Sequence, residues 1–186
     1  GGLATKYKPV IKPEDLKGMK IRAAGKMFET MLYEGAGAAI TSMPSSEIYF
    51  ALQTGALDAC MTSSSSFESY RLYEQVKYYN SPRKTTTWYM FEPLVISMAT
   101  WKKLSPEQQK IIMGVGKELE KFALEEAIKD DTEVTDLFKS KGVQVYDMTP
   151  EDFKVWFEVS KKTAWKTFAE KVKGGKELID MAQAVK

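Results

Sequence analysis

The chain has 186 residues, of which 44% are hydrophobic and 28% are charged, and its formal net charge is +2. This composition fits one globular domain, or two lobes that share the chain, with enough apolar residues for a core. A net charge near zero gives no electrostatic argument for binding nucleic acid, and no apolar stretch approaches the roughly 18 residues that a membrane span needs.

The chain contains no histidine and one cysteine, Cys60. A Ser-His-Asp triad, a Cys-His dyad and an imidazole metal site are therefore excluded, and no motif predicts a metal or a cofactor. Cys60 lies inside an apolar run, which predicts a small buried core residue and not a nucleophile. No basic and apolar signal segment opens the sequence, so we expect Gly1-Gly2 to mark a cleavage point or an engineering remnant.

Three short motifs place a proline where a helix begins and an acidic or amide residue directly after it: 12–16, 105–108 and 149–153. In the second and third motifs, Ser105 and Thr149 stand at the cap position, and Gln108 and Asp152 follow three residues later. This spacing predicts a capping box at each of these two helix starts.

The first half of the chain alternates between short apolar runs and helical periods. The apolar runs predict strands at three places: 19–23, 38–43 and 56–61. The helical spacing predicts three helices: 28–34, one capped by Ser45 or Ser46 and ended by Gly55, and 67–78. Strand, helix and strand at this spacing favour parallel βαβ units, in which helices cover both faces of a sheet.

The second half is dominated by one long helical pattern that runs from Pro106 to about Lys139 and stops at Gly142. A helix of about 34 residues would be about 50 Å long, so we expect it to span two lobes. Its apolar residues are predicted to face inward: Ile111, Ile112, Val115, Leu119, Phe122 and Ala127. The remaining predicted elements are an extended aromatic segment, a strand and two helices: 88–98, 143–146, 150–173 and 176–184. We interpret the aromatic face of the helix at 150–173 as core.

Polar residues follow two of the predicted strands. Arg22 stands near the end of the first strand, and the run Thr62 to Ser66 follows the third. In open parallel sheets, ligands bind beyond the carboxyl ends of the strands. A guanidinium offers a planar fork to a carboxylate, and hydroxyls and free N–H groups can bind its other oxygens. Two alternatives stay open: Arg22 could pair with an internal carboxylate, and the serine run could be only a helix cap and a loop.

Three longer motifs carry a family resemblance: PEDLKGMKIR at 13–22, MPSSEIYFALQTGALD at 43–58 and WKKLSPEQQ at 101–109. In this order and at these spacings they closely resemble the solute-binding proteins of TRAP (tripartite ATP-independent periplasmic) transporters, which are periplasmic receptors for organic acids. The resemblance covers nearly the whole chain.

The resemblance implies an α/β fold: a periplasmic-binding-protein-like lobe with a parallel-rich sheet flanked by helices, and a long helix that spans two lobes. It implies that residues 10–88 and 130–186 form the second lobe and that 89–130 belong to the first, most of which we expect to be absent from this chain. It also implies a periplasmic receptor without enzymatic activity. Its partners would be a small organic acid and the membrane subunits of a TRAP transporter, and not nucleic acid.

The resemblance also implies site residues. Arg22 matches the family's arginine that forms a salt bridge with the ligand carboxylate, and Thr62 matches another ligand contact. The chain departs from the family pattern at 58–63, which reads DACMTS where many members read DGQENP, and at Ser45, where many have an aromatic residue. These departures enlarge one side of the pocket, which nearby aromatic residues could fill, so we expect an acid with an apolar or aromatic body, or a 2-oxo acid. The complete predicted set is Arg22, Ser45, Thr62, Ser63, Ser64, Trp88 and Phe91.

Two other functions are alternatives to binding. A Ser/Lys-type hydrolase could pair Ser63 or Ser64 with Lys26. A non-ligand-binding interaction module would not respond to any small acid. If the first lobe is absent, the apolar residues of 111–122 would be uncovered, which predicts self-association of the chain.

Overall fold

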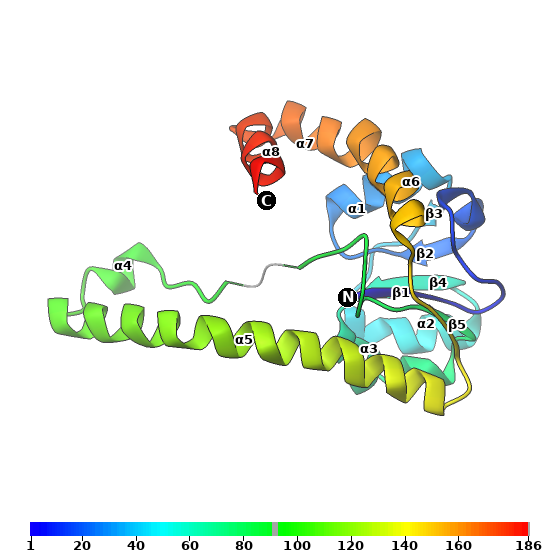
Figure 1. The fold of residues 1–186 in the computed structure, drawn as a ribbon, viewed down its shortest axis with the longest axis horizontal. Helices are drawn as coiled ribbons and strands as arrows, with labels where there is room; N and C mark the ends of the chain where they lie inside the picture. The colour runs from blue at the N-terminus through cyan, green and yellow to red at the C-terminus, as the bar shows by residue number, and fades with distance from the viewer. Residues whose placement is uncertain (91–92, 186) are drawn as a thin grey trace.

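The computed structural model describes residues 1–90 and 93–185, and its centre is a six-stranded mixed sheet (Figure 1). The strand order is β3-β2-β4-β1-β5-β6. The strands are β1 (Gly2–Thr5), β2 (Lys20–Arg22), β3 (Ala39–Ile40), β4 (Ala59–Thr62), β5 (Tyr78–Asn80) and β6 (Gln144–Tyr146). β2 runs parallel to β3 and β4, and β5 runs parallel to β6, whereas β1 is antiparallel to both of its neighbours.

The predicted α/β class and the parallel pairing of the first three predicted strands are confirmed, but two strands were missed. β1 has four residues, all buried, and so shows no alternation that the sequence could reveal. The predicted helix at 67–78 is wrong, because it breaks into α3 (Ser64–Ser69), the 3-10 turn η4 (Leu72–Glu74) and the start of β5. The break lies at Arg71, whose backbone is left-handed with φ of 53°, a conformation that no helix interior accepts.

Helices lie on both sides of the sheet (Figure 1). Besides α3, the described helices are α1 (Lys26–Thr30), which continues as the π-helical turn η2 (Met31–Gly35), α2 (Ile48–Thr54), α4 (Met98–Trp101), α5 (Pro106–Ser140), α6 (Pro150–Ser160), the π-helical turn η5 (Lys161–Trp165), α7 (Lys166–Lys171) and α8 (Gly175–Ala184). Two further 3-10 turns are η1 (Pro13–Leu16) and η3 (Ser45–Glu47).

The predicted helix ends are mostly confirmed. Both capping boxes form, at Ser105 before α5 and at Thr149 before α6. α2 ends at Gly55, whose φ of 76° favours glycine. The predicted serine cap before α2 is wrong: η3 starts at Ser45, and its cap residue, Pro44, has no side chain that accepts a hydrogen bond.

Two apolar cores lie on opposite faces of the sheet, because successive strand residues point to opposite sides. One core joins Leu3, Ile21 and Met61 of the strands to helices α1 and α6. The other joins Ala4 and Cys60 to helices α2, α3 and α5. Cys60 is fully buried, as predicted, and burial raises the pKa of its thiol to about 12.

Helix α5 is buried only near its carboxyl end, at Val134, Thr135 and Phe138. Residues 110–129 are all exposed, and this part of the helix extends away from the sheet beside α4 (Figure 1). The prediction that its apolar residues face inward is therefore wrong in this chain, since Ile111 and Phe122 are each 58% exposed. In the described part of the chain, no helix is both long and apolar enough to cross a membrane.

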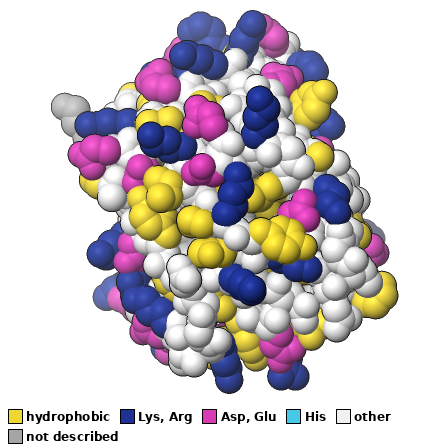
Figure 2. Space-filling view, turned by 90° about the vertical axis from the view of Figure 1, so that its right-hand side faces the viewer, with side chains coloured by type: hydrophobic (Ala, Val, Ile, Leu, Met, Phe, Trp, Pro, Cys, Tyr) yellow, Lys and Arg dark blue, Asp and Glu magenta, His cyan; other side chains and the backbone are white. Residues whose placement is uncertain are grey.

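The surface at the right-hand side of Figure 1 carries lysine, arginine, aspartate and glutamate side chains interspersed with apolar ones (Figure 2). Charges of both signs are mixed over this face. It therefore lacks the continuous basic stripe that binding to nucleic acid would use.

Candidate functional site

Arg22 is the last residue of β2, and its side chain reaches the carboxyl edge of the sheet. Its Nη1 donates to the carbonyl of Met61 at 2.8 Å, and its Nε donates to the carbonyl of Met43 at 3.1 Å. No carboxylate of residues 1–90 or 93–185 forms an ion pair with it; burial lowers the pKa of its guanidinium, and the charge of the Glu29 carboxylate opposes that shift. A guanidinium has five N–H donors, so donors remain for a ligand.

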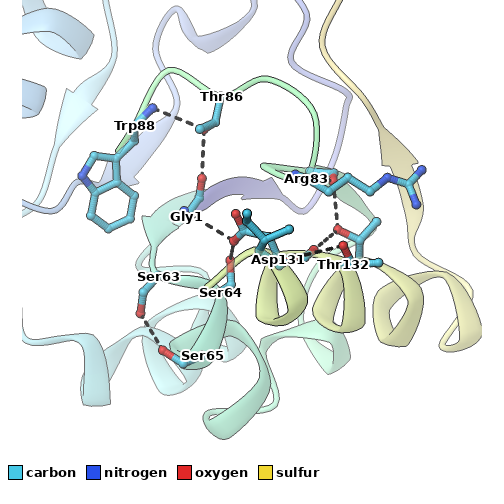
Figure 3. A network of polar contacts seen from close by, with 12 residues as sticks. Gly1, Ser63, Ser64, Ser65, Arg83, Thr86, Trp88, Asp131 and Thr132 are labelled. Atoms are coloured by element: carbon cyan, nitrogen blue, oxygen red, sulfur yellow. Dashed lines mark hydrogen bonds and ion pairs between the residues drawn. The ribbon is translucent and has the colours of Figure 1, made fainter. Parts of the chain in front are cut away.

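The run Thr62 to Ser66 divides into three roles. Thr62 ends β4 and is buried. Ser63 caps α3, because its Oγ accepts from the backbone N–H of Ser66 at 3.3 Å. The buried hydroxyl of Ser64 donates to Oδ1 of Asp131 on α5 (Figure 3). The run is thus partly a helix cap, as one alternative held, while Thr62 and Ser63 lie at the strand end beside the backbone that Arg22 binds.

Trp88 belongs to the core on the α1 side. Its ring meets the ring of Phe28 edge-on at 5.8 Å, and its backbone N–H donates to Oγ1 of Thr86 at 3.2 Å. A Cβ atom at Gly1 would lie 2.6 Å from both the Thr62 carbonyl oxygen and the Trp88 ring. Trp88 and Thr62 therefore flank the same stretch of backbone, as Figure 3 shows for Trp88 and Gly1.

Two residues of the predicted site remain, Ser45 and Phe91. Ser45 is half-buried at the start of η3, two residues after the carbonyl of Met43 that Arg22 binds. Phe91 lies outside the described residues. Arg22 thus links the backbone just before Ser45 to the backbone just before Thr62, and three segments distant in sequence meet at this edge of the sheet.

A polar seam that the sequence did not reveal joins α5 to this edge. Besides the bond from Ser64 to Asp131, the hydroxyls of Ser81 and Thr135 lie 2.8 Å apart in the interior. Asp131, Val134 and Phe138 share one helical face, by their spacing of three and four residues. The sequence could have indicated Asp131 by one feature: an acidic residue at helical spacing from the apolar residues Val134 and Phe138.

The structure does not bring Lys26 together with Ser63 or Ser64, the pairs that the hydrolase alternative requires. The Nζ of Lys26 lies 3.2 Å from Oε2 of Glu29 and is exposed, while Ser63 caps a helix and Ser64 binds Asp131. In the part of the chain that the structure describes, no cluster of three or more carboxylate or thiol side chains is placed to hold a metal ion.

The fold and this site define an α/β module with a cationic anchor at the carboxyl edge of its sheet. Residues 3–171 match the model of the family described as bacterial extracellular solute-binding protein, family 7 (DctP), so the chain belongs to this family. The predicted family is therefore confirmed, and its extracellular description agrees with the predicted periplasmic location.

Three similar proteins illustrate the match. A solute-binding protein of Albidiferax ferrireducens is 47% identical over 98% of this chain and 54% of its own length. The C4-dicarboxylate-binding periplasmic protein DctP of Shewanella loihica is 29% identical over 95% of this chain and 51% of its own length. A crystal structure of a TRAP periplasmic solute-binding protein from Rhodoferax ferrireducens with bound malonate has 47% identity and a TM-score of 0.91, over 98% of this chain and 57% of that one. The chain thus spans about half the length of the curated relatives it matches.

Proposed function

We propose that this chain is part of a periplasmic receptor that binds a small organic acid and delivers it to the membrane subunits of a TRAP transporter. The observation that carries the proposal is Arg22: a partly buried guanidinium at the carboxyl edge of the sheet, bound to two carbonyls and to no carboxylate of the described residues. Such a group is prepared to bind a carboxylate from a ligand. The family match and the relatives named for malonate and C4-dicarboxylates support the same ligand class.

The proposed contacts to the acid are Arg22, Thr62 and Ser63, with Ser45 at the rim. Ser64 and Trp88 would support them, since the hydroxyl of Ser64 is bound to Asp131 and Trp88 packs in the core. This division favours small acids, because the buried Trp88 ring contributes little wall for an aromatic ligand. We keep the 2-oxo and aromatic acids as members of the test panel.

A thermal-shift panel tests the proposal on the whole receptor, meaning a polypeptide of the relatives' length that includes these 186 residues. The panel contains malonate, succinate, a 2-oxo acid, benzoate and the uncharged analogue malonamide. At least one acid should raise the melting temperature, because a ligand at 100 times its Kd stabilises the folded state by about 2.7 kcal/mol. Malonamide should not. If no acid shifts the melting temperature, the binding function is refuted and the interaction-module alternative is favoured.

We also propose that residues 89–130 pack, in the whole receptor, against residues that this chain does not span, while 10–88 and 130–186 form one lobe. The exposed apolar residues of α5 support this, together with the greater length of the relatives.

Without such a cover, a surface of this kind favours association. We expect the 186-residue chain alone to self-associate in light scattering, whereas replacing Ile111, Val115 and Phe122 with glutamate should restore the monomer. A monodisperse 21.0 kDa species from the unsubstituted chain would contradict this arrangement.

A further inference from the structure

The Ser64–Asp131 bond is a side-chain link between the segment that follows Thr62 and helix α5. Ser64 is buried, and its hydroxyl donates to Oδ1 of Asp131. Ser64 directly follows Ser63, the residue that caps α3, and is two residues from Thr62. Fixing Ser64 therefore fixes the first turn of α3 and the end of β4 together.

Asp131 can hold this position because its own part of α5 is firmly packed. Val134 and Phe138 are fully buried on the same helical face, and the Thr135 hydroxyl bonds both Ser81 and the carbonyl of Asp131. The preceding residues 110–129 are exposed. Asp131 is thus at the point where α5 meets the body of the sheet, as Figure 3 shows.

The strand end is consequently held from two sides. On one side, Nη1 of Arg22 binds the carbonyl of Met61 at 2.8 Å. On the other side, Asp131 binds Ser64. Thr62 and Ser63 lie between these two attachments, so their placement relative to Arg22 depends on both.

One buried hydroxyl in this part of the core lacks a hydrogen-bond partner. The hydroxyl of Tyr79 is buried and has no hydrogen-bond partner among the described residues. Burial, and secondly the charge of Asp131, raise the pKa of Tyr79. Asp131 thus affects Tyr79 only through its charge, while its carboxylate accepts the hydrogen bond of Ser64.

We propose that Asp131 is a positioning residue for the organic-acid site: by binding Ser64 it places Thr62 and Ser63 to contact the same carboxylate as Arg22. This inference rests on the proposed function. Asp131 itself does not touch the acid, and the role requires only that it accept a hydrogen bond from Ser64.

The test measures, by calorimetry, the affinity of the whole receptor for malonate, or for whichever panel acid stabilises the unsubstituted receptor most. Asp131→Leu, which has a similar size but no acceptor, should bind about tenfold more weakly or worse, the scale of a hydrogen bond to a charged group. Ser64→Ala should lose about as much. Asp131→Asn keeps an acceptor oxygen and should stay within about threefold. The double variant Ser64→Ala/Asp131→Leu should be no more than about threefold weaker than either single one, because both remove one interaction.

Asp136→Asn is the matched control, since Asp136 lies on the same helix and pairs with Arg83 at 3.6 Å, away from Ser64. Its affinity should stay within about threefold. In the unliganded receptor, the amide resonances of Thr62 and Ser63 should move in Asp131→Leu and not in Asp136→Asn.

Each result decides a different point. Failure of the unsubstituted receptor to bind any acid refutes the proposed function itself. Binding by that receptor with unchanged affinity in Asp131→Leu or Ser64→Ala overturns only the role of Asp131, and so does equal loss in Asp131→Asn and Asp131→Leu. If Asp131→Leu fails to fold, Ser64→Ala and the asparagine variant still decide it.

Discussion

Replacing Arg22 with alanine is expected to lower the affinity of the whole receptor for its acid by about 2–5 kcal/mol, the usual cost of breaking a desolvated charge pair. This corresponds to a loss of roughly 30-fold to several thousand-fold. The reason is that the guanidinium is partly buried and would leave the ligand carboxylate unpaired if removed. Calorimetry at a temperature well below the melting temperature measures the change.

Two further variants make this result interpretable. Arg71→Ala removes an arginine whose side chain is 66% exposed and pairs only locally with Glu74, and it should leave the affinity within about threefold. Arg22→Lys keeps the charge but loses the fork geometry, so its affinity should lie between those of the alanine variant and the unsubstituted receptor. Near-normal affinity in a folded Arg22→Ala variant would remove Arg22 from the site.

Replacing Phe138 with alanine should lower the free energy of unfolding of the chain by about 3–5 kcal/mol, as expected for a large buried aromatic side chain. Phe138 is fully buried and its ring packs against those of Phe67, Tyr73 and Tyr79 at centroid distances of 5.6, 5.8 and 4.5 Å. These contacts attach α5 to the sheet. Denaturant unfolding monitored by far-ultraviolet circular dichroism measures the change.

Phe50→Ala supplies the matched control, because it makes the same substitution on helix α2 at an exposed position. It should change the free energy of unfolding by no more than about 0.5 kcal/mol. Similar destabilisation by the two substitutions would mean that burial of the Phe138 ring against the sheet is not what makes this position important for stability.

The sequence predicted most where a local rule determines the structure. Proline with a hydroxyl and an amide or acid three residues on determines the starts of α5 and α6, and Gly55 determines the end of α2. Between Pro106 and Gly142, the sequence contains no turn or strand pattern that would compete with a single long helix. At these helix ends the local preference agrees with the observed structure.

Prediction failed where the secondary structure of a segment depends on residues that are distant in the sequence. β1 and β5 become strands because they pair with each other and with β4 and β6, and neither has enough residues to show a period. The segment at 67–78 has apolar spacing that suits a helix. In the structure, however, Val76 packs in the core from a loop, and Tyr79 packs there from strand β5. The role proposed for Arg22 comes from its place at a strand end, whereas the role proposed for Asp131 depends on a contact between residues 64 and 131 that no local pattern contains.

The place of β1 in the sheet has a consequence for the order of folding. Ala4 lies opposite Cys60 on one side and opposite Tyr79 on the other, so this early strand joins two parallel blocks, β3-β2-β4 and β5-β6. Contacts of such long sequence separation close slowly, because the intervening chain loses entropy before they form. During synthesis β1 is made before β4 and β5, so it stays unpaired until one of these neighbours exists. Until it is paired on both sides, its free edge can pair with another chain and cause aggregation.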